Sequence, residues 1–196
     1  SESRFVEAIV APSFEPAAFE TITTRPKWGK SVRLLRASFD PPPSSRIEVR
    51  PISGGFLLQT PDDRLESASD LKVAAKHAPT PAEVDALLFA ATVAKHVRSN
   101  AIVLARGRTV VGVGAGQMSR VDAVRLALAK AGPRAKGSVL ASDAFFPFAD
   151  GVQEAVAAGV AAILEPGGSV RDAESIAAAD GAGAAMVFTD VRHFRH

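Results

Sequence analysis

Three glycines at alternate positions, Gly112, Gly114 and Gly116, follow directly on the apolar run 109–111. An amphipathic segment begins a few residues later, at 119–122. A strand, a glycine-rich turn and a helix in this order bring backbone N–H groups and a helix N-terminus to an anionic ligand. The same glycines also suit a tight turn or close packing. The local pattern supports the two interpretations about equally, and both place a strand before a helix.

Apolar runs and amphipathic segments alternate through the last two-thirds of the chain. Thr80 and Glu83 form a capping box, with Pro81 at the first helical position, and so mark a helix start. Helices are also expected at 119–131, 152–158 and 170–180, the last ended by Gly181 and Gly183, and strands at 71–73, 101–105, 109–113, 160–164 and 185–188. This alternation predicts an α/β layered fold with a mainly parallel sheet, made mixed by hairpins in the first half.

The first 70 residues are less regular. The elements expected there are a buried strand over 4–11, a helix over 16–20 that Ser13 caps and Pro26 stops, a strand over 32–35, a loop over 41–45, and a hairpin or turn formed by 47–50 and 55–59. Residues 62–70 are charged and irregular.

Composition excludes several classes of protein. A chain of 196 residues that is 47% hydrophobic and 22% charged forms one large domain or two small ones rather than a disordered region. A net charge of +2 without a basic stripe argues against nucleic acid as a partner. The absence of cysteine excludes disulfides, cysteine-based zinc sites and a thiol nucleophile. No apolar stretch approaches the roughly 20 residues of a membrane span. We therefore expect a cytoplasmic protein with no membrane partner. No signal peptide is evident, and because the first residue is Ser1 rather than Met we expect a fragment boundary there.

Two further segments are candidates for ligand binding at the carboxyl ends of the strands. The loop 166–169 precedes a helix for which Ser169 is the expected N-cap, and it could offer a second set of backbone N–H groups. The segment 142–150 places three of the eleven phenylalanines beside Asp143 and Asp150. Their rings could stack on a flat heterocycle while a carboxylate accepts from ring N–H groups. The alternative is a loop that fills the core, with Asp150 as the N-cap of the next helix.

Two cationic segments complete the candidates. The C-terminal residues include Arg192, His193 and His196 and follow the last buried strand directly, so they could be held at the same strand ends, although a tail is usually frayed. The two histidines lack an obvious third metal ligand. The pair Lys95-His96 invites a catalytic interpretation but is more often a favourable cationic cluster at a helix C-terminus.

Long, ordered stretches of this chain resemble the AICAR transformylase (phosphoribosylaminoimidazolecarboxamide formyltransferase) domain of the bifunctional purine-biosynthesis family PurH. The matching stretches are 95–103, 112–122, 137–151, 166–172 and 192–196. The resemblance is to the second half of that domain and is carried mainly by residues 71–196. Residues 1–70 match through 5–12 and 53–55 and are expected to belong to the same unit, so that 1–196 is the C-terminal half of the domain.

The resemblance implies a three-layer α/β/α fold of the cytidine-deaminase-like type, with a mixed sheet and no zinc. It implies formyl transfer from 10-formyltetrahydrofolate to the amine of AICAR ribonucleotide, giving FAICAR on the way to IMP. It also implies a homodimer, because the family's working site lies between two subunits, and it leaves open whether a monovalent cation is bound. By position, the residues that would hold the AICAR nucleotide are Asn100, Arg120, Phe145 and Arg192, and those that would line the folate site are Val121, Asp150, Ser169 and Val170.

The chain also departs from the family pattern. The family's catalytic pair lies in a Lys-His-x-Asn-Pro motif of the earlier copy of the fold, which this chain lacks. Lys95-His96 looks like the duplicated counterpart but is not followed by Asn-Pro, so no catalytic role is transferred to it. The preceding cyclohydrolase domain is also absent. We therefore expect a chain that supplies binding residues but is inactive alone. The alternative is a non-catalytic ligand-binding or assembly module that docks on the missing part of the enzyme.

Overall fold

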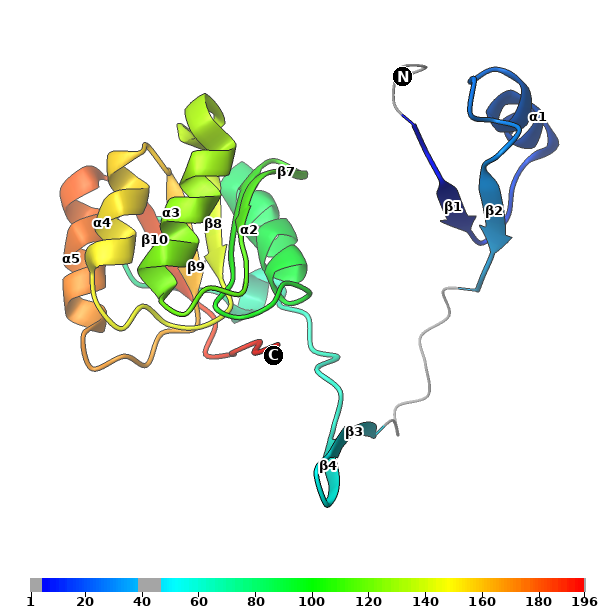
Figure 1. Cartoon of the computed structure of the whole chain (residues 1–196). Coiled ribbons are helices and arrows are strands. Elements are labelled where there is room, and N and C mark those ends of the chain that lie inside the picture. The colour runs from blue at the N-terminus through cyan, green and yellow to red at the C-terminus, as the bar shows by residue number, and fades with distance from the viewer. Residues whose placement is uncertain (1–4, 39–46, 196) are drawn as a thin grey trace. The chain divides into compact units, whose positions relative to one another are not determined.

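The computed structural model describes residues 5–38 and 47–195 of the chain. The chain divides into two compact units, Ser1–Pro61 and Asp62–His196 (Figure 1). No helix among the described residues is both long enough and apolar enough to cross a membrane.

The larger unit is built on a six-stranded sheet with the order β5-β10-β9-β8-β6-β7. Its strands are β5 (Lys72–Val73), β6 (Ile102–Arg106), β7 (Thr109–Gly114), β8 (Val139–Ser142), β9 (Ala162–Glu165) and β10 (Ala185–Phe188). Strands β8, β9 and β10 run parallel, whereas β5, β6 and β7 are antiparallel to their neighbours. The sheet is therefore mixed as expected, but it is not mainly parallel, because the tight turn at Gly107 returns β7 alongside β6 and β5 pairs antiparallel at the other edge.

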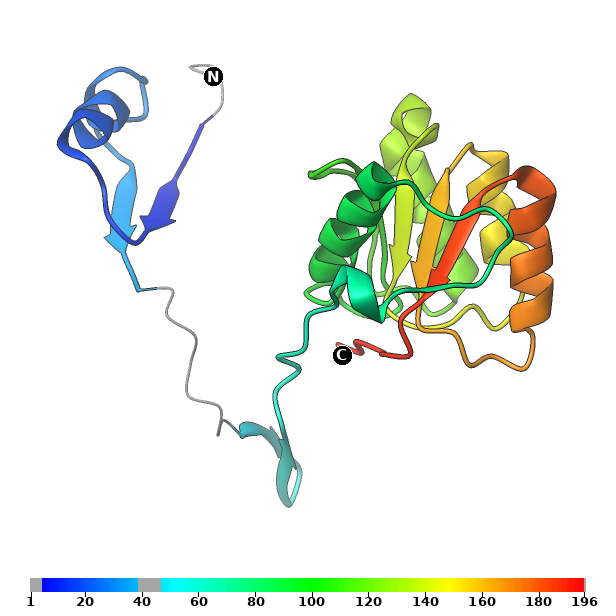
Figure 2. The same cartoon turned by 180° about the vertical axis from the view of Figure 1, so that it is seen from behind.

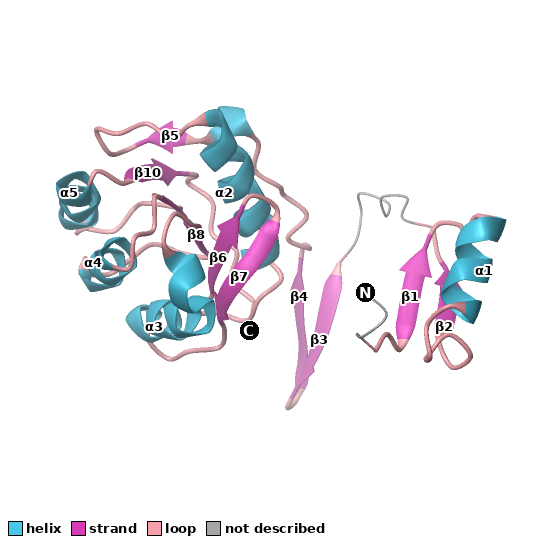
Figure 3. Cartoon of the chain, turned by 90° about the horizontal axis from the view of Figure 1, so that it is seen from above, coloured by secondary structure: helices cyan, strands magenta, loops and turns pink. Residues whose placement is uncertain are grey.

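Helices cover both faces of this sheet. They are α2 (Pro81–Ala94), α3 (Arg120–Ala131), α4 (Asp150–Ala157) and α5 (Asp172–Ala182), with short 3₁₀ turns η1 (Ala68–Asp70) and η2 (Gly132–Ala135). Helices α3, α4 and α5 lie on one face and α2 on the other, as seen from above in Figure 3 and from behind in Figure 2. Because strand side chains alternate, Ile102, Leu140 and Ile163 pack toward α3–α5 while Val103 and Leu164 pack toward α2. The result is a three-layer α/β/α arrangement.

Of the helix caps expected at Ser13, Thr80, Asp150 and Ser169, only the cap at Thr80 is present, and Ser119 provides a cap that the sequence did not predict. The Thr80 hydroxyl accepts from the N–H of Glu83 at 3.3 Å and the Glu83 carboxylate accepts from the N–H of Thr80 at 2.7 Å, which completes the capping box of α2. Ser119 likewise caps α3 by accepting from the N–H of Asp122 at 3.2 Å. Both helices begin where the sequence predicted, because these caps are local interactions.

The caps expected at Asp150 and Ser169 are wrong. Asp150 is the first residue of α4, with Ala149 in the cap position, and its carboxylate accepts from the N–H of Gly151. Helix α5 begins only at Asp172, with Arg171 rather than Ser169 in the cap position. The Ser169 hydroxyl accepts from the N–H of Arg171 at 3.1 Å, and the Asp172 carboxylate accepts from the N–H groups of Gly168 and Ser169 ahead of the helix. At its other end α5 runs through Gly181 and stops at Gly183, which has the left-handed φ of +69°.

The alternate glycines of β7 serve close packing. A Cβ atom on Gly112 would lie 2.1 Å from the carbonyl oxygen of Ala127, and one on Gly114 would lie 1.9 Å from that of Ala123, both in α3. Only Gly116, with φ of +65°, lies in the turn itself. The glycines therefore let the strand approach the helix that follows it, which is the second of the two interpretations open from the sequence.

The smaller unit contains a parallel β-α-β segment formed by β1 (Ala8–Ala11), α1 (Pro16–Thr24) and β2 (Arg33–Arg36). Helix α1 ends before Pro26 as expected, but Glu15 rather than Ser13 occupies its cap position, without a side-chain hydrogen bond. The strand expected to be buried over 4–11 is shorter and partly exposed, with Val10 51% exposed, because β1 belongs to a sheet of only two described strands. Its first residue, Arg4, lies outside the described residues.

The hairpin expected between 47 and 59 is confirmed as β3 (Glu48–Ile52) paired antiparallel with β4 (Gly55–Gln59). The loop expected over 41–45 lies outside the described residues.

Candidate functional site

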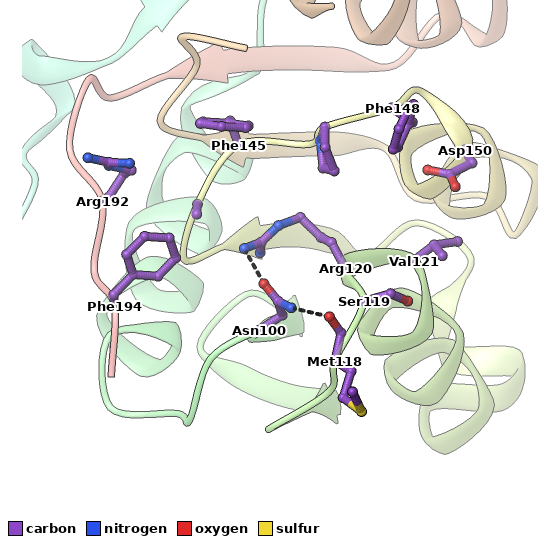
Figure 4. A pocket seen from close by; sticks show the side chains of 12 residues that line it. Asn100, Met118, Ser119, Arg120, Val121, Phe145, Phe148, Asp150, Arg192 and Phe194 are labelled. Atoms are coloured by element: carbon purple, nitrogen blue, oxygen red, sulfur yellow. Dashed lines mark hydrogen bonds between the residues drawn. The ribbon is translucent and has the colours of Figure 1, made fainter. Parts of the chain in front are cut away.

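A cavity of about 460 Å³ opens at one edge of the larger sheet. The start of β6 and the ends of β7 and β8 meet at this edge, because Ile102 pairs with both Gly114 and Ser142. The segments that follow or precede these strand ends, together with the chain after β10, supply the lining. The lining residues are Asn100, Met118, Ser119, Arg120, Val121, Ala144, Phe145, Pro147, Phe148, Asp150, Arg192 and Phe194 (Figure 4).

Arg120, at the start of α3, is fixed by the fold rather than free in the cavity. Its side chain is buried, and Nη1 donates to Asp143 Oδ1 at 2.5 Å and to Ser142 Oγ at 2.7 Å. Nη2 donates to Asn100 Oδ1 at 2.8 Å (Figure 4). A guanidinium has five N–H donors, and these bonds use three of them. Arg120 thus presents an oriented donor whose charge is compensated within the protein.

Asn100 is oriented by the same network. Its side-chain amide donates to the carbonyl oxygen of Gln117 at 2.9 Å and to that of Met118 at 3.3 Å, while its own oxygen accepts from Arg120. The amide is therefore fixed in one orientation by partners on both sides.

Asp143 joins three segments of the site. Besides Arg120, its carboxylate accepts from Ser99 Oγ at 2.5 Å and from the N–H of Ala101 at 3.1 Å. Its carbonyl oxygen accepts from the N–H of His193 at 2.9 Å. The sequence interpretation treats Asp143 only as one of two carboxylates beside the phenylalanines. A signal for it is nevertheless present, since a carboxylate that directly follows a buried strand needs a partner.

The segment between β8 and α4 has both roles that the sequence left open: part of it fills the core and part of it lines the cavity. Phe146 is buried and packs so tightly against Gly151 that a Cβ there would lie 2.8 Å from its ring. Phe145 and Phe148 line the cavity instead, together with the exposed carboxylate of Asp150. The guanidinium of Arg171 lies over the Phe148 ring at 4.8 Å from its centroid.

The C-terminal segment lies against the cavity. Arg192 and Phe194 both line it, with the Arg192 guanidinium 5.5 Å from the centroid of the Phe194 ring (Figure 4). His193 between them is buried. His196 lies outside the described residues.

The loop 166–169 does not present a free anion cradle. The carboxylate of Asp172 accepts from the N–H of Gly168 at 2.7 Å and from that of Ser169 at 3.1 Å, so the chain's own anion occupies these donors. Neither Ser169 nor Val170 is among the residues that line the cavity, and the Val170 side chain is fully exposed.

Glu165, at the end of β9, is a buried acid that sequence reasoning did not single out. Its Oε2 accepts from the N–H of Phe146 at 2.6 Å, while Oε1 has no hydrogen-bond partner among the described residues. Burial raises the pKa of Glu165 to about 8, so the side chain is mostly protonated at neutral pH. A neutral acid thus holds the backbone of the phenylalanine segment beside the cavity.

The pair Lys95-His96 lies away from the cavity lining. Lys95 is buried and its Nζ donates to the carbonyl oxygen of Arg64 at 2.8 Å, rather than to the last carbonyls of α2. His96 is exposed. Among the described residues no group of three or more His, Cys, Asp or Glu side chains is arranged to hold a metal ion.

Comparison with known proteins gives consistent matches. The family model described as AICARFT/IMPCHase bienzyme matches residues 1–130. Proteins named "Bifunctional purine biosynthesis protein PurH" are 51% identical in Synechococcus elongatus, 53% in Chloroflexus aurantiacus and 49% in Myxococcus xanthus, each over 98% of this chain. The chain covers 36–37% of the length of these relatives.

Among solved structures, Acinetobacter baumannii RibD, form 2, matches with a TM-score of 0.39 and 14% sequence identity, over 51% of this chain and 32% of that one. A likeness of this size carries no argument about fold or function. The sequence matches do, because the family model covers well over half of the residues and the identity extends along nearly the whole chain. The chain belongs to the AICARFT/IMPCHase bienzyme family.

Proposed function

We propose that this chain supplies nucleotide- and folate-binding residues for formyl transfer from 10-formyltetrahydrofolate to AICAR ribonucleotide, which gives FAICAR in purine biosynthesis. One observation carries the proposal: six of the eight positions assigned by resemblance line a single cavity of about 460 Å³. These positions come from four segments that are far apart in the sequence.

The nucleotide is assigned to Asn100, Arg120, Phe145 and Arg192. The chemistry of these side chains supports the assignment, because Phe145 offers a ring face to a flat imidazole and Arg192 offers an exposed cation to a phosphate or carbonyl group. Asn100 and Arg120 are already oriented by a hydrogen bond to each other, and Arg120 also bonds to Asp143, so binding a ligand would cost them little conformational entropy.

The folate is assigned to Val121 and Asp150, which lie at the starts of α3 and α4, and to Ser169 and Val170. A carboxylate at Asp150 can accept hydrogen bonds from pterin N–H groups. The proposal includes Ser169 and Val170 on sequence similarity alone, since they lie outside the cavity lining.

Formyl transfer needs groups that this chain lacks. The substrate amine attacks the formyl carbon, the C–N bond to the folate breaks, and protons must leave the amine and reach the folate nitrogen. The Lys-His-x-Asn-Pro motif is absent from the sequence, so we infer that the chain binds and orients substrates while the rest of the enzyme supplies the proton transfers. We further infer a homodimer, a cytidine-deaminase-like class for the three-layer unit, and that residues 1–196 form the C-terminal half of the transformylase domain.

Isothermal titration of the purified chain with AICAR ribonucleotide, followed by a formyl-transfer assay, tests the proposal. We expect binding of the ribonucleotide, weaker binding of the corresponding nucleoside that lacks the phosphate, and no turnover. Turnover by the chain alone would refute its dependence on the missing part. Equal affinity for nucleotide and nucleoside would remove the assigned cations from phosphate recognition.

The second candidate function is a non-catalytic assembly module. The apolar side chains exposed in the smaller unit favour it, among them Val49 at 55%, Phe56 at 67% and Leu58 at 67% exposure. This alternative predicts no binding of nucleotide or folate by the chain, but tight association with the remainder of the enzyme produced separately.

A further inference from the structure

His193 occupies an unusual place beside the cavity. Its neighbours Arg192 and Phe194 both line the cavity, as Figure 4 shows, whereas the His193 side chain is buried elsewhere, with only 6% of it exposed. Exposure alternates along this segment, since Arg192 and Phe194 are exposed and His193 between them is buried. His193 anchors the segment to the protein interior. Its position therefore determines where Arg192 and Phe194 lie at the cavity.

Two carboxylates hold the His193 ring, one on each nitrogen. Nδ1 lies 2.6 Å from Asp62 Oδ2, and Nε2 lies 2.5 Å from Glu66 Oε1. A neutral imidazole has only one N–H, so it can donate to only one of two ionised carboxylates. When both carboxylates are ionised, this geometry fits the doubly protonated, cationic form of His193.

The positive and negative charges of the side chains in the cluster around the His193 ring are equal in number. Asp62 also lies 3.9 Å from Lys95 Nζ, at the end of α2, so two acidic and two basic side chains form one cluster. The hydrogen bond with Glu66 raises the pKa of His193 despite the opposing effect of burial, and Asp62 adds to the rise. Burial opposes ionisation of Glu66, but the hydrogen bond from His193 and the nearby charge of Lys95 hold the pKa of Glu66 below its usual value.

We propose that His193 is a positioning residue: its imidazolium, held between Asp62 and Glu66, keeps Arg192 and Phe194 at the cavity, and deprotonation at alkaline pH loosens this segment. The contact from Asp143 to the N–H of His193 fixes the backbone at the same point, so the side chain sets the orientation of the segment. The consequence for ligand affinity rests on the function proposed above.

Glu66→Gln is the informative variant. Its amide can donate to Nε2 of a neutral His193, whose Nδ1–H still donates to Asp62, so the segment stays anchored without the second proton. His193→Gln removes the ring and cannot bond both carboxylates in the same way. His77→Gln is the matched control, because His77 is an exposed histidine of the same unit that is not among the residues lining the cavity.

The first measurement needs no ligand. In the full chain, nitrogen NMR should show both ring nitrogens of His193 protonated at neutral pH, and amide protection factors for residues 191–195, corrected for intrinsic exchange, should fall as pH rises toward about 9.5. The Glu66→Gln chain should keep this protection across the same range. A singly protonated His193 at neutral pH, or the same pH profile in Glu66→Gln, would overturn the proposal.

The second measurement is the affinity for AICAR ribonucleotide between about pH 7.5 and 9.5, where its phosphate is fully ionised. We expect the wild-type Kd to rise about 10-fold over this range, and His193→Gln to bind about 10-fold more weakly than the wild type at pH 7.5. The Glu66→Gln profile should be flat, and His77→Gln should follow the wild type. A flat wild-type profile contradicts the proposal.

The two measurements distinguish a failure of the proposed function from a failure of the positioning role of His193. If no chain binds the nucleotide but protection of 191–195 still depends on pH in the wild type and not in Glu66→Gln, the proposed function fails and the positioning role stands. If His193→Gln does not fold, Glu66→Gln alone decides the question, because it keeps the histidine.

Discussion

At the scale of single residues, the candidate site is organised by buried charges that bond to each other. Asp143 is the charge partner of Arg120, and the side chains of Asp143 and Arg120 are 0% and 5% exposed, respectively. Breaking such a buried pair costs far more than breaking a surface pair, because it leaves an uncompensated charge. The residues that line the cavity therefore depend on residues that do not. Arg192 differs, since it lies exposed on a segment that other residues hold.

Arg192→Ala in the intact enzyme should weaken the affinity for AICAR ribonucleotide by about 1.5–3 kcal/mol, because a charge-assisted hydrogen bond to the ligand is lost. Titration calorimetry measures this directly. Arg134→Ala is the control, since Arg134 bonds to carbonyl oxygens of α3 at the end of the helix away from the cavity. An unchanged affinity in Arg192→Ala would remove Arg192 from the site.

Glu165→Gln should flatten the dependence of stability on pH. The pKa of Glu165 is about 8 in the folded chain and 4.5 in the reference state, so the folded chain binds the proton more tightly. This contribution to stability is fully present below about pH 4.5 and is lost as pH rises through about 8. The variant stays neutral, and its oxygen can still accept from Phe146. It should therefore be more stable than the wild type at pH 9, by roughly 2–5 kcal/mol, and close to it at pH 5.

Urea unfolding at both pH values gives the free energies needed. Glu174→Gln serves as the comparison, since Glu174 is an exposed member of a surface ion pair and should change stability by less than about 1 kcal/mol. A Glu165→Gln chain that loses stability between the two pH values as the wild type does would show that Glu165 is not the titrating group.

At the scale of elements, the unit of strand β7 and helix α3 positions Arg120 and Val121 at the cavity. The strand can approach the helix only because Gly112 and Gly114 carry no side chain at the contact. Helix α3 then starts at Arg120, directly after the Ser119 cap that orients its first turn. Packing and capping together aim the helix N-terminus at the cavity edge of the sheet.

Gly114→Ala should destabilise the chain by about 1–3 kcal/mol or more, because the added Cβ would lie 1.9 Å from the Ala123 carbonyl oxygen and α3 would have to move. Gly181→Ala is the matched control. Gly181 lies within α5, and a Cβ added there would have no atom within 4 Å, so the change should stabilise by about 0.5–1 kcal/mol through helix propensity. Denaturant unfolding distinguishes the two, and equal effects would contradict the packing role of Gly114.

At the scale of the whole molecule, the two units differ in how they bury apolar surface. The larger unit has a core on each face of its sheet. In the hairpin β3–β4, by contrast, Val49 pairs with Leu58 and Pro51 with Phe56, so that one face of the hairpin is apolar and open. A two-stranded hairpin is marginally stable without further packing. This face of the hairpin is therefore a candidate surface for association.

The isolated chain should therefore self-associate through this hairpin. Replacing Phe56 and Leu58 together by Ser should shift it toward the monomer in size-exclusion chromatography with light scattering, because the exposed apolar area falls. Leu57→Ser, on the opposite face of the same strand, should have a smaller effect. Association that persists unchanged in the double variant would place the contact elsewhere.

Much of the element order could be predicted because it depends on neighbours in the chain. The caps at Thr80 and Ser119 and the hairpin of β3 and β4 all rest on contacts within a few residues. The cap predicted at Ser169 was wrong, because α5 begins two residues later than expected, with Arg171 in the cap position, although the Ser169 hydroxyl does accept from the N–H of Arg171.

The amino-acid sequence by itself determined the α/β class, the starts of α2 and α3, and the family. Tertiary structure alone decided that His193 meets Glu66, 127 residues earlier, that Asp143 joins Arg120 to the C-terminal segment, and that Glu165 is buried. The physical reason is that caps and turns are short-range interactions, whereas burial and pairing of charges depend on which segments the folded sheet brings together.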